Sequence, residues 1–173
     1  MKRTTMTNHV KAFKREAMHL LRFQLASQRI SLFYNIKEIS RSEFADQLIA
    51  LKAIENDMVI RVCKFDDNTK GVHSFIKAVH EIPISNPDKV LIEQKTKQFG
   101  ALIKDLKQNR RNEQLAHLKI NSTDGQYVPH YHVLPAINLV IEIIDLMAGS
   151  KISYLWKDGQ YEEIDLRAEV LKS

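Results

Sequence analysis

Apolar residues recur at helical spacing along most of the chain, and short polar segments separate the helical stretches. The first stretch covers about residues 8–39 and is long for a single helix, which suggests a break near Ser27 to Ser31. The second begins after Ser40-Arg41-Ser42-Glu43, a capping box in which the first Ser accepts a backbone N–H and the Glu reaches back to the cap. The polar run from Asp66 to Gly71 ends this second helix.

Two further helices are predicted before the middle of the chain. The first covers Val72 to about Ile82, where apolar residues again return with helical spacing. The next begins at Asn86-Pro87-Asp88, because Asn is a favoured N-cap, Pro fits the first turn and Asp complements the positive end of the helix dipole. This helix is expected to run through Leu106 toward a group of basic residues.

The second half of the chain holds one more strong helical pattern. A loop from Asn121 to Val133 precedes a helix from Leu134 to Ala148, which Gly149 ends. Ile152 to Trp156 fits either a helical turn or a short strand. The prediction is therefore an all-α, antiparallel bundle of about five helices. It forms a single domain over residues 1–173, with residues 150–173 as a C-terminal extension.

Composition limits the class of protein. A chain of 173 residues with 44% hydrophobic residues can bury a sizeable core in one domain. The net charge of +5 permits an anionic partner without proving one.

The single cysteine, Cys63, cannot form an intramolecular disulfide, and we expect it to be a buried thiol in an apolar helix. No apolar region follows Lys2 and Arg3, and no stretch approaches the roughly 18 apolar residues of a membrane span. We therefore expect a cytoplasmic protein without a membrane segment.

The segment Arg110-Arg111-Asn112-Glu113-Gln114-Leu115-Ala116-His117 carries the most distinctive chemistry. Arg is a permanently charged fork that holds phosphate oxygens, and His exchanges protons near neutral pH. A second interpretation is purely structural. Lys104, Lys107 and the two arginines would complement the C-terminal dipole of their helix, and His117 would be a half-buried residue between leucines.

Helix geometry limits how these residues can act together. Each residue advances about 100° around a helix, so Arg110 and His117 would share a face. Arg111 would lie about 120° away from His117 on the same helix. Arg111 can therefore come close to His117 only if the helix bends or begins nearby, or if a second subunit presents its own Arg111 and His117.

Two segments of the chain resemble one known family. Arg111-Asn112-x4-His117 resembles the R-x(4–6)-H motif of the HEPN superfamily, and its Arg-Asn-x-x-x-Ala-His form is similar to the AbiU2-like branch. Asn56 to Asp66, followed by Val72-His73-Ser74-Phe75, resembles that branch's apolar helix, short linker and Ser-containing helix. The likeness covers about residues 10–150.

The resemblance implies a helical bundle that dimerises with its Arg-His motifs facing across a cleft, and a metal-independent endoribonuclease of a phage-defence or toxin–antitoxin system. The RNA 2′-OH would attack its own phosphate, with His117 as general acid or base, Arg111 stabilising the developing charge, and Asn112 holding an oxygen or orienting the histidine. The product would carry a 2′,3′-cyclic phosphate, and no metal or other cofactor would be needed. The cations expected to bind the RNA are Lys107, Arg110 and Lys119.

The implied partners are a second copy of the chain, RNA, and an antitoxin or other protein. Some HEPN toxins carry, two residues after the His, a Tyr that a nucleotidyltransferase antitoxin modifies, and Lys119 occupies that place here. A different function class also fits the chain, namely a non-catalytic helical dimer that binds a protein or nucleotide. That reading predicts a buried or dispersed Arg and His and an exposed apolar groove.

His130-Tyr131-His132 suggests a metal site, because two His in a loop can chelate an ion. Asp124 is the only nearby acid, and no Cys supplies a further ligand. The simpler interpretation is a loop that packs Tyr127 and Tyr131 on the bundle or stacks them on single-stranded bases. The sequence therefore predicts no metal.

Overall fold

The computed structural model describes residues 2–32, 39–83, 87–108, 130–157, 159–160 and 162–171. This part of the chain is mainly helical, which confirms the all-α prediction. The elements are α1 (Lys2–Leu32), α2 (Arg41–Lys64), α3 (Phe75–Glu81), α4 (Lys89–Leu102), α5 (His130–Ala148), β1 (Leu155–Trp156), β2 (Ile164–Asp165) and α6 (Leu166–Val170).

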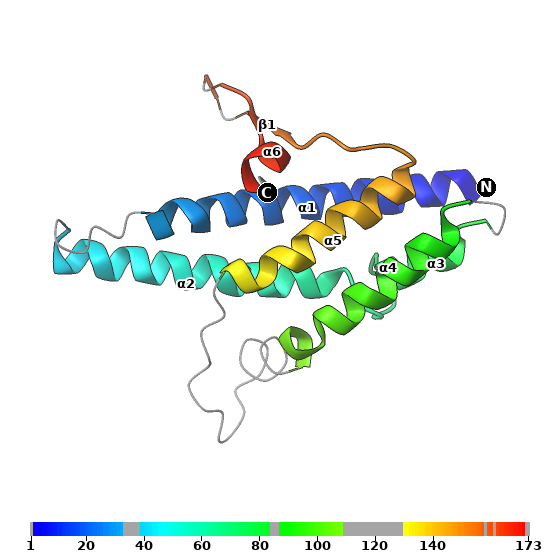
Figure 1. Ribbon diagram of the computed structural model, residues 1–173, viewed down its shortest axis with the longest axis horizontal. Helices are drawn as coiled ribbons and strands as arrows, with labels where there is room; N and C mark the ends of the chain where they lie inside the picture. Colours follow the sequence, from blue (N-terminus) through cyan, green and yellow to red (C-terminus); the bar gives the residue numbers. More distant parts are fainter. Residues whose placement is uncertain are drawn as a thin grey trace.

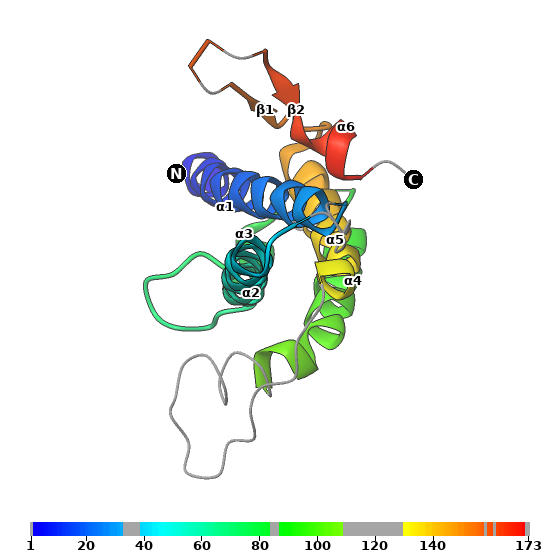
Figure 2. The same ribbon diagram turned by 90° about the vertical axis from the view of Figure 1, so that its left-hand side faces the viewer.

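Two long antiparallel helices form the frame of the bundle. Figure 1 shows α1 and α2 side by side, with α5 crossing over them and running antiparallel to α1. The helix α1 packs against α2, α3, α5 and α6, and α4 packs against α5 and α3. Seen along the frame in Figure 2, α4 and α5 form one side of the bundle and the C-terminal strands and α6 lie beyond α1.

The first helix is continuous, and the expected break near Ser27 to Ser31 is wrong. Its buried face, which includes Phe13, Leu20 and Leu21, continues through Gln24 and Ser27 without interruption. Because α5 and α2 cover this face along its length, tertiary packing supports a helix longer than local propensity alone would favour.

The capping box at the start of α2 is confirmed. The backbone N–H of Glu43 donates to Ser40 Oγ at 3.2 Å, and the backbone N–H of Ser40 donates to Glu43 Oε2 at 3.1 Å. The two contacts satisfy donors that the first turn of a helix leaves free. The helix then ends at Lys64, close to the expected polar run.

The helix α3 begins at Phe75, later than the expected Val72. The backbone N–H of Phe75 donates to the carbonyl of Phe65 at 2.8 Å, which closes the preceding loop. The ammonium of Lys77 donates to the carbonyls of Thr69 and Val72. These bonds hold residues 69–74 in a loop, so the helix cannot extend back to Val72.

The boundaries of α4 also differ from the prediction. Its N-cap is Asp88 and not Asn86, which lies outside the described residues. The regular helix ends at Leu102, and after a turn at Ile103 residues 104–108 are again helical, finishing in a π-helical turn.

The helix α5 begins at His130, so the expected loop from Asn121 to Val133 is wrong at its C-terminal end. Pro135 lies inside this helix, in its second turn. A proline there removes only one hydrogen bond of the helix, and burial of the surrounding apolar positions offsets this loss. The predicted end is confirmed: the helix stops at Ala148, and Gly149 takes the left-handed conformation with φ of 70°.

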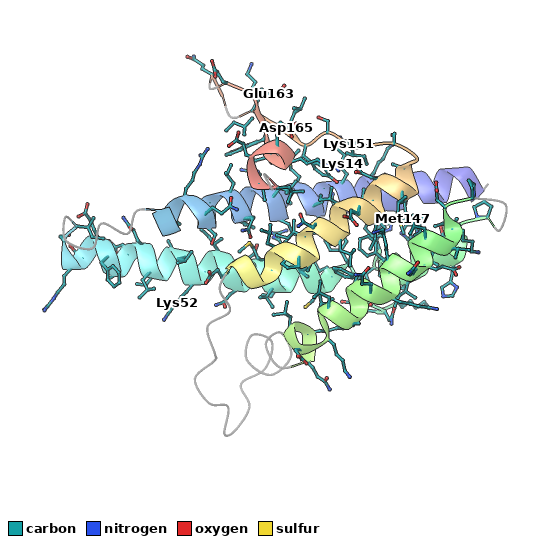
Figure 3. All side chains as sticks on the ribbon, viewed as in Figure 1. Lys14, Lys52, Met147, Lys151, Glu163 and Asp165 are labelled. Atoms are coloured by element: carbon teal, nitrogen blue, oxygen red, sulfur yellow. The ribbon has the colours of Figure 1, made fainter. Side chains whose placement is uncertain are left out.

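The C-terminal extension belongs to the same core as the long helices. Leu155 pairs with Asp165 and Trp156 with Ile164 in a short antiparallel ladder, which confirms the strand alternative for this segment. The hydrophobic residues Tyr154, Leu166 and Val170 are buried. Figure 3 labels Glu163 and Asp165 on the part of the hairpin that leads into α6.

Aromatic rings form the centre of the core at one end of the bundle. Phe13, Phe65, Phe75 and Phe99 contact one another with centroid separations of 4.9–6.4 Å. Cys63 is buried, as expected. None of the helices in the described part of the chain is long and apolar enough to cross a membrane.

Candidate functional site

Most of the predicted ribonuclease residues lie in residues 109–129, outside the part of the chain that the structure describes. These residues are Arg110, Arg111, Asn112, His117 and Lys119. The two ends of this segment are described, at Gln108 and at the start of α5. The helices α4 and α5 pack against each other and run in opposite directions, as Figure 1 shows.

Lys107 is the one predicted site residue with a described side chain, and it forms a specific ion pair. Its Nζ lies 2.7 Å from Asp66 Oδ2 and 2.7 Å from the carbonyl oxygen of the same residue. Both side chains are largely buried, with 29% of Lys107 and 17% of Asp66 exposed. The ammonium is therefore held by the segment that follows α2, and it fastens residues 104–108 to the bundle just before the Arg-His segment.

The neighbouring charges around the end of α2 are also paired. Arg61 Nη1 lies 2.8 Å from Glu16 Oε1, and Lys64 Nζ lies 3.2 Å from the same oxygen. Arg61 also pairs with Asp57. Burial alone would lower the pKa of the Arg61 guanidinium, but hydrogen bonds and charge from the two acids outweigh it, so the pKa is raised. The pairs on Glu16 join α1 to α2, and the two cations balance the negative charge of the Glu16 carboxylate.

A second polar cluster, which the sequence analysis did not find, joins α1 to the loop before α3 and to the last residue of α3. His9 is buried, and its Nε2 lies 3.3 Å from Glu81 Oε1. The Nδ1 atoms of His9 and His73 lie 3.0 Å apart. The three residues thus form a chain of polar contacts from Glu81 through His9 to His73.

The contacts indicate where the protons lie when both histidines are neutral and His9 Nε2 donates to Glu81. A carboxylate oxygen accepts hydrogen bonds, so a neutral His9 carries its proton on Nε2, toward Glu81. Its Nδ1 is then an acceptor, and His73 must donate from Nδ1. The remaining nitrogen of a neutral His73, Nε2, is therefore an unprotonated acceptor.

His73 borders a cavity of about 420 Å³ between α1, the end of α2 and the loop that follows it. Phe13 and Phe65 form an apolar floor, and Arg15 and Lys64 contribute positive charge. Figure 2 shows the loop after α2 standing out beside α2 and α3. Sequence patterns alone do not reveal this site, because its residues come from segments far apart in the chain.

No metal centre is found where side chains are described: no group of three or more His, Cys, Asp or Glu residues there could hold an ion. The side chains of His130 and His132, and all of Tyr127, lie outside that set. The two histidine positions belong to α5 and not to a loop. Positions two apart on a helix are separated by about 200°, which is unfavourable for chelating one ion.

No family model, curated protein or solved structure shows a significant match to this chain. The functional argument therefore depends on the residues themselves and on the part of the fold that holds them.

Proposed function

We propose that this protein is a metal-independent endoribonuclease in which Arg111 and His117 act on an RNA phosphate. In this proposal it is a cytoplasmic member of a phage-defence or toxin–antitoxin system, similar to the AbiU2-like branch of the HEPN superfamily. Asn112 orients the reacting groups, and Arg110 and Lys119 bind neighbouring phosphates. Lys107 could join them only by exchanging its partner Asp66 for a phosphate.

The observation that carries the proposal is the anchoring of the Arg-His segment. The all-helical bundle is the architecture that the family resemblance implies. Lys107 fixes the chain before the segment to Asp66, and the packed helix α5 fixes the chain after it. A loop or helix held at both ends to rigid elements can keep a catalytic Arg and His at a constant separation, which is what proton transfer and charge stabilisation require.

The proposed reaction is a transesterification. A base removes the proton of the RNA 2′-OH, the 2′-oxygen forms a bond to phosphorus, and the bond from phosphorus to the 5′-oxygen breaks. An acid gives a proton to that leaving oxygen, and the product ends in a 2′,3′-cyclic phosphate. His117 serves as base or acid, and Arg111 neutralises charge on the phosphorane. In a dimer with facing motifs, one His117 can act as base and its copy as acid.

The test compares His117→Ala and Arg111→Ala with Lys104→Ala, which removes an exposed cation nearby. Each protein is incubated with a panel of labelled single-stranded and hairpin RNAs, and its helical content is measured by circular dichroism. We expect each of the first two variants to lose at least about 100-fold in cleavage rate and to stay folded. The Lys104 variant should cleave at nearly the rate of the original protein.

Two results would count against the proposal. If the unaltered protein leaves every RNA in the panel intact, the ribonuclease assignment is wrong. If either motif variant loses its helical content, that residue has a structural role.

A non-catalytic binding module is the second candidate, and one observation favours it. The helix α4 exposes apolar side chains, with 76% of Val90, 41% of Leu91 and 46% of Leu102 accessible. Exposed apolar residues on one helix are a feature of surfaces that bind another chain. Absence of RNA cleavage together with formation of a stable complex through α4 would support this candidate.

A further inference from the structure

We propose that the cavity between α1, the end of α2 and the loop after it binds a small organic anion, that is, a carboxylate or phosphate attached to an apolar ring. This site uses none of the residues of the proposed ribonuclease centre. Its volume of about 420 Å³ falls within the range of about 300–1,000 Å³ that is typical of small-molecule sites.

The floor of the cavity is apolar and aromatic. Phe13 and Phe65 are each only 2% exposed and contact each other, and Ile60 and Ala12 complete this part of the lining. Both phenylalanines are held by further ring contacts with Phe75, so the floor is rigid. A flat apolar group can therefore bind there without ordering the protein, which keeps the entropic cost of binding low.

The acidic residues of the lining are engaged by the protein itself. Glu16 accepts from Arg61 and Lys64. Asp67 accepts from the backbone N–H of Thr69 at 2.9 Å and from its hydroxyl at 2.6 Å. The charge of Glu16 is therefore balanced by two cations, whereas Asp67 keeps its negative charge and directs Oδ1 toward Thr69.

Arg15 is the cation that remains available for a ligand. It is exposed and lines the cavity, and no described side chain forms an ion pair with it. A guanidinium binds carboxylate or phosphate through two parallel N–H donors, which gives both attraction and a fixed orientation. The lining therefore combines an apolar floor with one unpaired cation above it.

His73 adds a polar contact. Its Nδ1 lies 3.0 Å from Nδ1 of His9, which in turn contacts Glu81, and Nε2 has no hydrogen-bond partner among the described residues. A neutral His73 can accept a hydrogen bond at Nε2 from a ligand hydroxyl, and a protonated His73 can donate to the anionic group. Both forms suit an acid that carries a ring and an oxygen substituent.

The test uses phenyl phosphate and benzoate as probes, with binding followed by isothermal titration calorimetry and by chemical-shift changes of the His73 ring. The unaltered protein should bind at least one probe in the millimolar range or tighter. Benzyl alcohol, which lacks the charge, and inorganic phosphate, which lacks the ring, should each bind about tenfold more weakly, since each loses one of the two contacts.

Three variants separate this site from general attraction to a basic protein. Arg15→Gln should weaken binding of the probes about tenfold. Lys14→Gln removes an exposed charge of α1 that is adjacent to Arg15 in sequence and does not line the cavity, and should leave binding unchanged. Ala12→Leu should fill part of the cavity and abolish binding while keeping a good helix former in α1.

Equal effects of the Arg15 and Lys14 variants would overturn the proposal, as would full binding by Ala12→Leu. Absence of binding to both probes at millimolar concentration would also overturn it. These readouts measure binding and not RNA cleavage, so the result is independent of whether the ribonuclease proposal succeeds.

Discussion

Lys107 and Asp66 join the helical turn before the Arg-His segment to the residues that follow α2. The ammonium lies 2.7 Å from the carboxylate and 2.7 Å from the backbone carbonyl of the same residue, 41 positions earlier in the chain. The Lys107 side chain thus donates to two acceptors where α2, the loop after it and the helical residues 104–108 meet. This junction holds the described residues that immediately precede the proposed catalytic segment.

Lys107→Ala should lower the free energy of unfolding by about 1–3 kcal/mol, because Asp66 would keep a partly buried charge without its partner. Urea denaturation followed by circular dichroism measures the change. Lys104→Ala, at an exposed position on the same turn, should change stability by less than about 0.5 kcal/mol. Equal effects of the two variants would show that the ion pair contributes nothing beyond charge at a helix end.

The capping box predicts a similar local effect at the start of α2. Ser40→Ala removes the hydroxyl that accepts from the backbone N–H of Glu43, and should cost about 1 kcal/mol of stability. Ser42→Ala removes a nearby hydroxyl that contacts only Ser40 Oγ and serves as the control. Thermal unfolding measures Tm for both variants. If Tm falls equally in Ser40→Ala and Ser42→Ala, loss of the capping box does not explain the lower stability of Ser40→Ala.

The sequence was sufficient where local patterns determine structure. The start of α2 follows from the capping box, the end of α5 follows from Gly149, and the apolar stripe of α2 follows from periodicity. These signals involve residues within one or two helical turns, so an isolated sequence contains them in full.

The sequence was insufficient where distant contacts decide the outcome. The strand Leu155–Trp156 exists because Asp165 and Ile164 pair with it, and α3 starts late because Phe75 bonds to Phe65. The same limit applied to the sites. The partner of Lys107 lies 41 positions away in sequence, and the contact between His9 and His73 spans 64 positions.

The histidine pair should make stability depend on pH. Burial lowers the pKa of His73 below its ordinary value of 6.5, and charge on His9, Arg15 and Lys77 lowers it further against the opposing effect of Glu81. The folded protein therefore disfavours protonated His73. The stabilisation is complete above the unfolded-state pKa and is lost as the pH falls below about 6.5. His73→Gln should reduce the fall in Tm between about pH 7.5 and about pH 5.5.

The control for this effect is His80→Gln, which changes an exposed histidine of the same helix as Glu81. This variant controls for the loss of a histidine from the surface of α3. If Tm falls by the same amount in His73→Gln and in the unaltered protein between about pH 7.5 and about pH 5.5, His73 does not cause the pH dependence of stability.

We expect the protein to form a homodimer. Arg111 and His117 are six positions apart, an unfavourable spacing for gripping one phosphate from a single helix, and two facing copies would complete the site. Two-fold dimers are also the commonest closed assembly. Light scattering should give twice the chain mass of 20.1 kDa at micromolar concentration. A purely monomeric protein under these conditions would require each chain to hold a complete site.

RNA cleavage should persist in EDTA, because the proposed mechanism takes its positive charge from Arg111 and its proton transfers from His117, and no step uses an ion. The products should end in 2′,3′-cyclic phosphate, detected by mass spectrometry. An RNA with a single 2′-deoxy sugar at the cleavage site should stay intact, since it lacks the attacking hydroxyl, and DNA should not be cut. The rate at limiting enzyme should fall as salt rises, because phosphate contacts release counterions. Loss of activity with chelator and its return with added metal would falsify this mechanism, and His130→Ala and His132→Ala would then identify whether these two residues supply the ligands.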